Sequence, residues 1–377
     1  YDGPVVYVPD ASRSVGVVQN LLSDDPGNFL AEVAADYDRV RTQHANKKQI
    51  PIWPLAKARA NKTPIDWQGY TPPCPKFIGK RQFRNFDLAE LAQFIDWGPF
   101  FQTWDLAGRF PEILKDEVVG TEAARVFADG QDMLKRLTEG RWLTANGVIG
   151  LYPANTVNDD DIAIYTDDTR SEVAMVWHGM RQQAEKHVID GVMRPSRCLA
   201  DFIAPRETGI QDYIGLFAVT AGIGVDKKEK NFLDDLDDYS AITLKSLADR
   251  LAEAFAECLH QRVRTDLWGY ASDEKLANTE LIAEKYRGIR PAPGYPACPD
   301  HSAKRAMFDL LAANEIGMEL TESLAMMPAA SVSGFYLSHP QSTYFNVGRI
   351  GDDQLADMVQ RRGMEEKELR RLVGSNL

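Results

Sequence analysis

An α+β fold is predicted by the order of the sequence patterns along this chain of 377 residues. Helical patterns come first, strand-like runs follow between residues 147 and 220, and helical patterns then return. Because the strands follow one another without long helices between them, a mainly antiparallel sheet is favoured over βαβ alternation. We expect one large domain whose sheet is flanked by helices, preceded by a helical and extended linker.

The N-terminal residues resemble the end of an α/β unit. Residues 4–8 (PVVYV) have a buried-strand pattern, and residues 14–23 (SVGVVQNLLS) have a helical pattern. A parallel strand needs neighbours and two covered faces, so this short unit cannot fold by itself. Since the chain begins at Tyr1, without a methionine or a signal-peptide pattern, we expect it to be a piece of a longer polypeptide.

A linker is expected next. An apolar i, i+4 stripe from Phe29 to Val40 predicts a charged helix from Asn28 to about Lys47. Six prolines between residues 49 and 76 then favour an extended segment that wraps over a surface. We therefore place a remnant of a preceding domain at 1–23, a linker at 24–76 and the main domain at 77–377.

The main domain opens with helical patterns and continues with strands. Residues 87–95 (DLAELAQFI) are helical, and a second helix is expected from about Glu112 to Leu137. Five strand-like runs follow, separated by turn residues, at residues 147–154, 161–168, 172–180, 198–205 and 212–220. These runs supply the predicted antiparallel sheet.

A long helix is expected from about Tyr239 to Leu267. Its apolar residues fall on one stripe, at Leu247, Leu251, Phe255, Leu259 and Val263. Residues 301–315 predict another amphipathic helix, and residues 330–350 predict two strands joined by a turn that contains Pro340.

Two helices are expected at the C-terminal end. Asp352 or Asp353 can cap the first, which runs through Arg362 and can be closed by Gly363. Residues 364–373 (MEEKELRRLV) give the second.

Composition argues against several classes of function. A net charge of -12 and a pI near 5.1 would repel nucleic acid and an acidic membrane surface. No apolar run approaches the roughly 18 residues of a membrane span. The four cysteines are far apart and the six histidines show no HxH or HExxH spacing, so neither a disulfide framework nor a protein-only metal site is indicated. Reduced thiols in the cytoplasm fit best.

A proline-rich loop at residues 287–301 (RGIRPAPGYPACPDH) is the main candidate for a binding site. Proline fixes φ and lacks an N–H, so this backbone is stiff, irregular and able to offer polar groups to a ligand. Arg290 and Tyr295 bracket the turn. The alternative is a surface crossover whose prolines only restrict the unfolded chain. The glycines at 222–224 do not form a dinucleotide fingerprint, and no GxSxG motif is found.

Carboxylates form two further candidates. Asp249, Glu253 and Glu257 are spaced i, i+4, i+8 on one helical face, which is usually solvated but could also hold a group from a partner domain. Asp96 precedes Trp97 and two phenylalanines, where a carboxylate is costly unless it is paired or hydrogen-bonded. The alternative role of Asp96 is to cap a helix.

At these motifs the chain closely resembles the C-terminal reactivation domain of cobalamin-dependent methionine synthase. The resemblance is dense over residues 77–377 and is carried above all by IDWGPFFQTWDLAG at 95–108, GIRPAPGYPACPDH at 288–301 and SVSGFYLSHPQSTYF at 331–345. It implies a curved α+β domain that binds S-adenosylmethionine in a shallow surface groove.

The resemblance also implies roles for individual residues in binding S-adenosylmethionine. Asp96 would hold the methionyl amino group, and Arg290 would hold the carboxylate. Tyr295 would act as the positioning residue near the sulfonium and the corrin. The remaining contacts would come from backbone at Ala292 and Gly294 and from the groove walls at Tyr344 and Phe345. A zwitterion needs one acid and one base, and a methyl sulfonium is well served by carbonyls and aromatic faces.

Cobalamin is expected to be carried by a neighbouring domain. Residues 1–23 resemble the end of that domain, with Ala11 near the cobalamin nucleotide tail. The DxHxxG motif with the axial histidine is absent from this chain, so it should not hold cobalamin tightly by itself. Asp249, Glu253 and His301 would face the docked cobalamin domain. Zinc is expected only in another domain of the parent enzyme.

The parent enzyme would make methionine from homocysteine and methyltetrahydrofolate, as a cytoplasmic methyltransferase. This region would reactivate it after oxidation to cob(II)alamin, with a methyl group from S-adenosylmethionine and an electron from a flavodoxin-type donor or a diflavin reductase. We expect a monomer. The alternative function is a non-catalytic docking module for flavodoxin and the cobalamin domain, and a generic small-molecule methyltransferase is disfavoured because the glycine motif of that fold is missing.

Overall fold

The computed structural model describes residues 5–8, 11–23, 25–45 and 50–377. Contacts between residues divide the chain into two compact units, Tyr1–Pro51 and Ile52–Leu377. Among the described residues, none of the helices is both long enough and apolar enough to cross a membrane.

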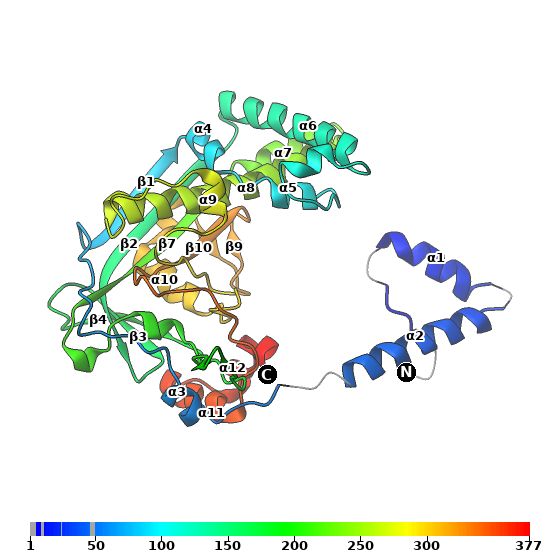
Figure 1. The fold of residues 1–377 in the computed structure, drawn as a ribbon. Coiled ribbons are helices and arrows are strands. Elements are labelled where there is room, and N and C mark those ends of the chain that lie inside the picture. Colours follow the sequence, from blue (N-terminus) through cyan, green and yellow to red (C-terminus); the bar gives the residue numbers. More distant parts are fainter. Residues whose placement is uncertain (1–4, 9–10, 24, 46–49) are drawn as a thin grey trace. The chain divides into compact units, whose positions relative to one another are not determined.

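The smaller unit contains two helices, α1 (Ala11–Leu21) and α2 (Gly27–Ala45), as the sequence predicts (Figure 1). The strand expected at residues 4–8 does not form at residues 5–8, which have no regular secondary structure. Such a strand needs a neighbouring strand for its hydrogen bonds, and the described part of this unit has none. Residue 4 and the expected helix end at Lys47 lie outside the described residues.

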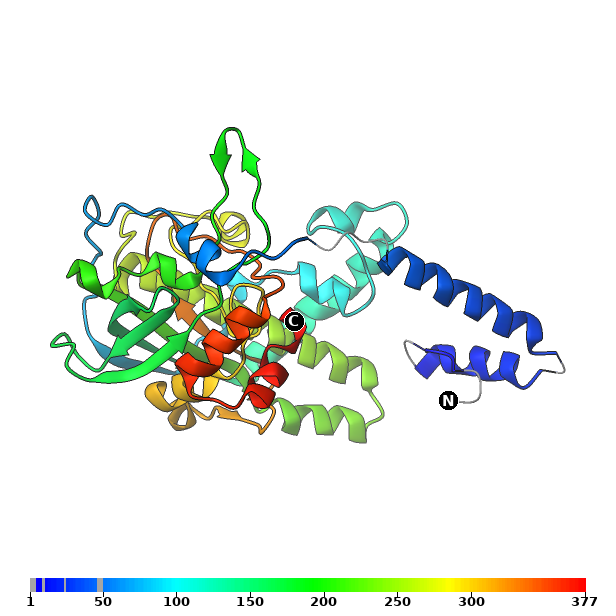
Figure 2. The same cartoon turned by 90° about the horizontal axis from the view of Figure 1, so that it is seen from below.

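The larger unit is built on one antiparallel sheet, which confirms the predicted α+β class. Its strands are β1 (Gly79–Phe86), β2 (Thr144–Val157), β3 (Asp161–Tyr165), β4 (Val173–His178), β7 (Asp212–Ile223) and β10 (Ser331–Tyr336). The strand order is β10-β7-β2-β3-β4, and β1 pairs with the first half of β2. Two short ribbons accompany the sheet, β5 (Val188–Ile189) with β6 (Val192–Met193) and β8 (Glu319–Leu320) with β9 (Met326–Met327). The β5–β6 ribbon protrudes from the unit (Figure 2).

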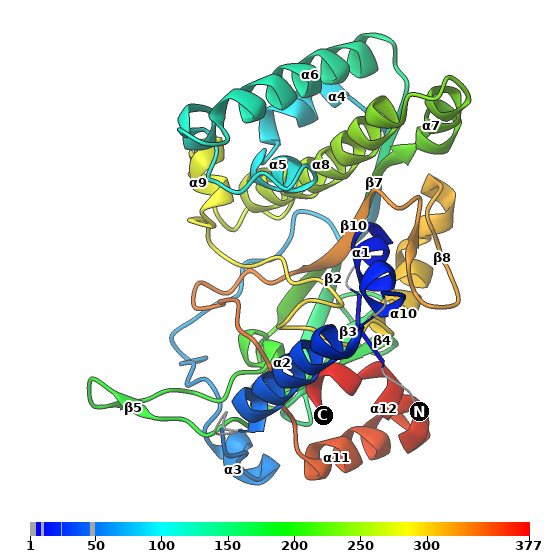
Figure 3. The same ribbon diagram turned by 90° about the vertical axis from the view of Figure 1, so that its right-hand side faces the viewer.

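Helices cover both faces of this sheet and its two ends. The first face is packed by α4 (Leu88–Leu91), α5 (Gly98–Gln102), α6 (Gly120–Glu139), α7 (Val225–Asp234) and α8 (Asp238–Arg262). The predicted apolar stripe of α8 is buried there, so it is confirmed. On the opposite face lie α10 (Ala303–Leu311) and two 3₁₀ turns, Leu199–Phe202 and Ala313–Ile316. The sheet curves from α5–α8 at one end to α11 (Asp352–Arg362) and α12 (Glu366–Leu372) at the other (Figures 1 and 3).

Further short elements connect these layers. They are α3 (Leu55–Ala60), α9 (Asn278–Ile282), a π-helical turn at Val263–Leu267, and 3₁₀ turns at Ala92–Phe94, Glu112–Lys115, Arg206–Thr208 and Gly374–Asn376. As predicted, Gly363 closes α11 in the left-handed conformation, with a φ of 60°.

The predicted linker residues 52–76 lie along the larger unit, which confirms the expected wrapped segment. Trp53 donates its N–H to the Gln183 carbonyl at 2.7 Å, and Thr63 donates its hydroxyl to Asp201 at 2.8 Å. Near the other end, the Trp268 indole donates to the Pro73 carbonyl at 2.7 Å. The one feature that the prolines did not indicate is the short helix α3.

Three predicted elements are wrong in detail. The helix expected from Glu112 breaks before α6, because the Asp116 side chain accepts hydrogen bonds from the backbone of Val118 and Val119 and so forms a turn. Residues 198–205 contain the 3₁₀ turn Leu199–Phe202 instead of a strand, because the buried Asp201 carboxylate accepts the Cys198 N–H.

The third error is the second strand expected within residues 330–350. Only β10 forms, and residues 338–350 are irregular. Their polar groups bond to the proline-rich loop instead of to a strand. The Tyr344 hydroxyl accepts the Arg290 N–H at 2.9 Å, and Val347 donates its N–H to the Pro296 carbonyl at 2.9 Å.

Candidate functional site

The proline-rich loop is irregular, as predicted, and a tight turn presents Tyr295. Gly294 has a φ of +99°, and its N–H donates to the Cys298 carbonyl at 2.8 Å. A Cβ atom at Gly294 would lie 2.1 Å from the His301 ring, so only glycine fits this turn. The turn leaves Tyr295 58% exposed.

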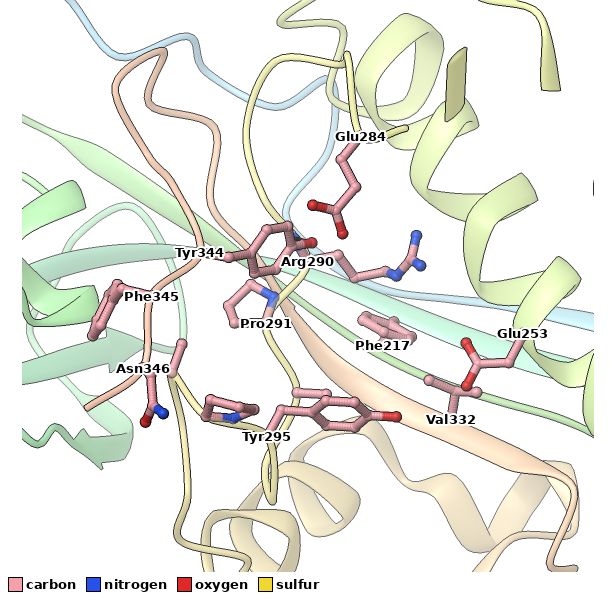
Figure 4. A pocket seen from close by; sticks show the side chains of 13 residues that line it. Phe217, Glu253, Glu284, Arg290, Pro291, Tyr295, Val332, Tyr344, Phe345 and Asn346 are labelled. Atoms are coloured by element: carbon pink, nitrogen blue, oxygen red, sulfur yellow. Dashed lines mark hydrogen bonds between the residues drawn. The ribbon is translucent and has the colours of Figure 1, made fainter. Parts of the chain in front are cut away.

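Two adjoining hollows lie beside this loop. The apolar hollow has a volume of about 480 Å³ and is shown in Figure 4. Its apolar walls come from Phe217, Pro291, Ala292, Ala297, Val332, Tyr344 and Phe345. The acidic hollow, of about 360 Å³, is lined among others by the charged residues Asp96, Arg250, Glu253, Glu257, Glu284 and Arg290. Both are lined by Glu253, Glu284, Arg290 and Tyr295, so we treat them as one site, the Arg290 groove.

The guanidinium of Arg290 is bonded to protein groups through Nη1, and its other two nitrogens can bind a ligand. Its Nη1 donates to Glu257 Oε2 at 2.9 Å and lies 3.5 Å from His260 Nδ1. Among the described residues, no acceptor is bonded to Nε or Nη2, although the side chain is only 16% exposed. Burial alone lowers the pKa of this guanidinium, yet Glu257 and nearby tyrosines raise it overall, so Arg290 is a permanent cation. Its free edge can therefore bind an anion with two parallel hydrogen bonds.

Three carboxylates around the groove have free oxygen atoms. Asp96 uses Oδ1 to accept the Gly98 N–H at 2.9 Å, and it also lines the groove. The alternative role as a helix cap is wrong, because the N-cap position of α5 is Trp97. The side-chain carboxylates of Glu253 on α8 and Glu284 after α9 make no hydrogen bond to any described residue. Burial raises the pKa of Glu284, although Arg290 opposes this shift. A cationic ligand group is the natural partner for such carboxylates.

Two tyrosines support the backbone of Arg290. The Tyr344 hydroxyl, which accepts the Arg290 N–H, lies 3.5 Å from the Tyr286 hydroxyl. Burial raises the pKa of both phenols, so they stay protonated at neutral pH. The site therefore joins an apolar wall, the Arg290 guanidinium with two unbonded nitrogens, and several carboxylates with free oxygen atoms. This combination suits a zwitterionic ligand with an apolar part.

Comparison with known proteins agrees with this geometry. Residues 87–363 match the family described as vitamin B12 dependent methionine synthase, activation domain. A crystal structure of the MetH reactivation domain bound to AdoHcy is 51% identical to this chain, with a TM-score of 0.83. The match covers 87% of this chain and 99% of that one.

This chain belongs to the activation-domain family of vitamin B12-dependent methionine synthase. The predicted resemblance is thus confirmed, and so is the assignment of the chain to a cobalamin-dependent methyltransferase. The fold predicted for the activation domain is confirmed by the same structure.

The activation domain brings most of the predicted site residues together. Those that line the Arg290 groove are Asp96, Glu253, Arg290, Ala292, Tyr295, Tyr344 and Phe345. Gly294 and His301 instead line a neighbouring hollow of about 310 Å³. Asp249 is exposed on α8, one turn before Glu253, and Ala11 is the first residue of α1 in the smaller unit.

Other groove residues were not predicted from the sequence. Phe217 on β7 and Val332 on β10 reach the groove because their strands are neighbours in the sheet. Glu284 follows α9 with a φ of +53°, and no sequence motif marks it. Glu257 was placed on the acidic face of α8, but its pairing with Arg290 depends on tertiary structure. Within the described ranges, no group of His, Cys, Asp and Glu side chains could hold a metal ion.

Proposed function

We propose that this activation domain binds S-adenosylmethionine in the Arg290 groove and supports reductive methylation of cob(II)alamin to methylcobalamin. The observation that carries the proposal is the free Nε and Nη2 edge of Arg290, which lies in the groove across from unpaired carboxylates. An α-carboxylate would bind that edge, and Asp96 would accept from the α-amino group. The AdoHcy-bound relative supports the same ligand class.

The rest of the groove suits the other parts of this ligand. Tyr344 and Phe345 provide an apolar wall for the adenosyl group, and backbone at Ala292 would offer polar contacts. Gly294, which lines the neighbouring hollow, would contribute through the turn that presents Tyr295. Tyr295 and Glu253 lie beside the place of the sulfonium, a cation that a ring face and a carboxylate stabilise. The exposed Tyr295 ring would position the methyl group toward the incoming corrin. The domain thus contributes positioning and exclusion of water.

Cobalamin is the substrate of this reactivation, and it would be delivered by the cobalamin-binding domain of the same polypeptide. Residues 1–23 are the proposed end of that domain, with Ala11 near the nucleotide tail, and 24–76 are the proposed linker. Asp249, Glu253 and His301 would face the docked domain. A flavodoxin-type donor or a diflavin reductase would supply one electron, and the methyl group would pass from the sulfonium to cobalt, releasing S-adenosylhomocysteine. We place the protein in methionine biosynthesis, as a cytoplasmic monomer.

Calorimetric titration of this chain with S-adenosylmethionine tests the proposal. We expect wild type to bind and Arg290→Ala to lose at least tenfold in affinity, since truncating one partner of a charged pair costs about 2 kcal/mol or more. Arg206→Ala, at an exposed arginine outside the groove, is the matched control and should bind like wild type. The absence of binding to wild type would refute the site. Adding the cobalamin domain and a reductant, and following methylcobalamin absorbance, then distinguishes methylation from docking alone.

A further inference from the structure

A buried chain of alternating charges runs from Arg290 into the protein. Arg290 Nη1 lies 2.9 Å from Glu257 Oε2. The other oxygen of Glu257 forms an ion pair with Arg264 Nη1 at 3.5 Å, without a hydrogen bond. Arg264 Nη2 lies 2.8 Å from Glu274 Oε1. The side chains of Glu257, Arg264 and Glu274 are 12%, 0% and 8% exposed. Two arginines thus alternate with two glutamates, and their formal charges cancel.

Two members of this series of charges, Glu257 and Arg264, lie at the C-terminal end of α8 and in the turn that follows it. Glu257 and Arg264 are seven residues apart, which corresponds to two turns on the same helical face. Between them α8 changes into the π-helical turn Val263–Leu267, a rare geometry that is frequent at functional sites. The sequence of this turn, VRTDL, contains no glycine or proline, so tertiary contacts hold it. One of these contacts is the Arg264–Glu274 pair, in which Arg264 Nε donates to Glu274 Oε1 at 2.9 Å.

Aromatic rings enclose the same corner of Arg290. The His260 ring stacks on Tyr336 with centroids 5.2 Å apart, and it meets the edge of Tyr286 at 4.8 Å. His260 and Tyr336 are completely buried. The guanidinium therefore has little freedom to rotate once Nη1 is bonded to Glu257.

We propose that Glu257, anchored by Arg264 and Glu274, is the positioning residue that orients Arg290 for the ligand carboxylate. By taking Nη1, Glu257 leaves Nε and Nη2 as one flat edge facing the groove, the geometry that a carboxylate binds with two parallel hydrogen bonds. Without Glu257 the guanidinium could rotate and present other edges. This inference rests on the proposed function and adds a specific role for Glu257, which lines the acidic hollow, and for Arg264 and Glu274 next to it.

The test compares two ligands that differ only in the carboxylate, S-adenosylmethionine and decarboxylated S-adenosylmethionine. Calorimetric dissociation constants are measured for the whole chain as wild type and as Glu257→Gln, with thermal unfolding as a check of the fold. We expect Glu257→Gln to bind S-adenosylmethionine about tenfold more weakly, or 1.4 kcal/mol. Its affinity for the decarboxylated ligand should stay within about twofold of wild type. That ligand has no carboxylate to bind Arg290, so its affinity does not depend on the orientation of the guanidinium.

Two further variants keep the test decisive. Glu274→Gln changes the end of the charge series that is farthest from Arg290. It should weaken binding of S-adenosylmethionine but not of the decarboxylated ligand, with a smaller loss of affinity than Glu257→Gln. This variant serves as the test even if Glu257→Gln does not fold. Glu253→Gln, one turn earlier on α8, lines the groove without a bond to Arg290, so it should affect both ligands equally.

Each outcome bears on one of the two proposals. An equal loss for both ligands in Glu257→Gln would show a direct or merely structural role and would overturn the inference, as would no loss for S-adenosylmethionine. If wild type binds neither ligand, the proposed function itself fails. If wild type binds but Glu257→Gln loses affinity equally for both ligands, only this inference fails.

Discussion

Two buried arginines in the larger unit differ in how many of their hydrogen-bond donors are used. All five N–H donors of Arg181 are bonded, to carboxylates of Asp160 and Asp201 and to the carbonyls of Asp159 and Ser196. Among the described residues, the guanidinium of Arg290 has partners at Nη1 only. Arg181 therefore has no N–H donor left to bind a ligand, whereas Arg290 has unbonded donors and lines a groove.

The partners of Arg181 explain its different role. Asp160 also accepts from Arg59 at 2.8 Å, and Asp201 also accepts from Thr63, so this network fastens residues 52–76 to the larger unit. A buried arginine is therefore not by itself a sign of a binding site. Free donors that face a hollow distinguish a ligand-binding arginine from a structural one.

The largest expected effect comes from breaking the saturated network. Arg181→Met leaves Asp201 buried without its cation, while Asp160 keeps Arg59, and removing one partner of a buried pair costs about 3–5 kcal/mol. Urea denaturation should show this loss. Folded Arg181→Met should still bind S-adenosylmethionine like wild type, and a selective loss of affinity without loss of stability would erase the distinction between the two arginines.

Arg290→Lys sharpens the same comparison from the groove side. Lysine keeps the positive charge but cannot offer two parallel N–H donors, so we expect the affinity for S-adenosylmethionine to fall by about 1.4–2 kcal/mol, at least tenfold. The free energy of unfolding should change much less than in Arg181→Met, since Glu257 still has Arg264 nearby. Calorimetry and urea denaturation measure the two quantities. Unchanged affinity would mean that the ligand does not bind the two parallel N–H donors of Arg290.

Acid should weaken the surroundings of Arg290 in a predictable way. Burial and the neighbouring cations Arg264 and Arg290 lower the pKa of His260 well below 6.5. The folded state therefore binds fewer protons at His260 than the unfolded state, and the stability that His260 contributes above pH 6.5 is lost as the pH falls. One such group changes the free energy of unfolding by at most about 1.4 kcal/mol per pH unit.

Urea denaturation between pH 7 and 5 checks this dependence. His260→Gln should show a shallower slope than wild type. His339, whose pKa burial lowers to about 4, acts in the same direction and is present in both proteins. Equal slopes for wild type and His260→Gln would mean that His260 is not held neutral.

The smallest effect is expected from the hydroxyl that supports the loop. Tyr344→Phe leaves the Arg290 N–H without its acceptor, which should lower the free energy of unfolding by about 1 kcal/mol. Tyr286→Phe is the matched control, because its hydroxyl meets only the Tyr344 hydroxyl, at 3.5 Å. Thermal unfolding of the two variants should rank Tyr344→Phe as less stable, and the reverse order would contradict this role.

The fold was predictable where local patterns decide the structure. The apolar stripe of α8 specifies a helix by its periodicity, and the short apolar runs of β2, β3 and β7, bounded by turn residues, specify strands. Residues 198–205 and 338–350 were not predictable in this way, because Asp201 and Tyr344 form bonds to residues distant in the sequence that override strand propensity.

The candidate site shows the same division. Arg290 and Tyr295 stood out because the prolines require an irregular loop, and the family resemblance then suggested their roles. Glu284 and Phe217 carry no local signal, since only tertiary packing brings them to the groove. Likewise, the pattern of α8 indicates an acidic face at Glu257 but cannot show which cation it meets.

A crystal structure of this chain with S-adenosylmethionine tests the central claim most directly. We expect the ligand carboxylate within hydrogen-bonding distance of Nε and Nη2 of Arg290, with Nη1 still bonded to Glu257 and the adenosyl group against Tyr344 and Phe345. A ligand bound outside the Arg290 groove, or one whose carboxylate faces away from Arg290, would contradict it.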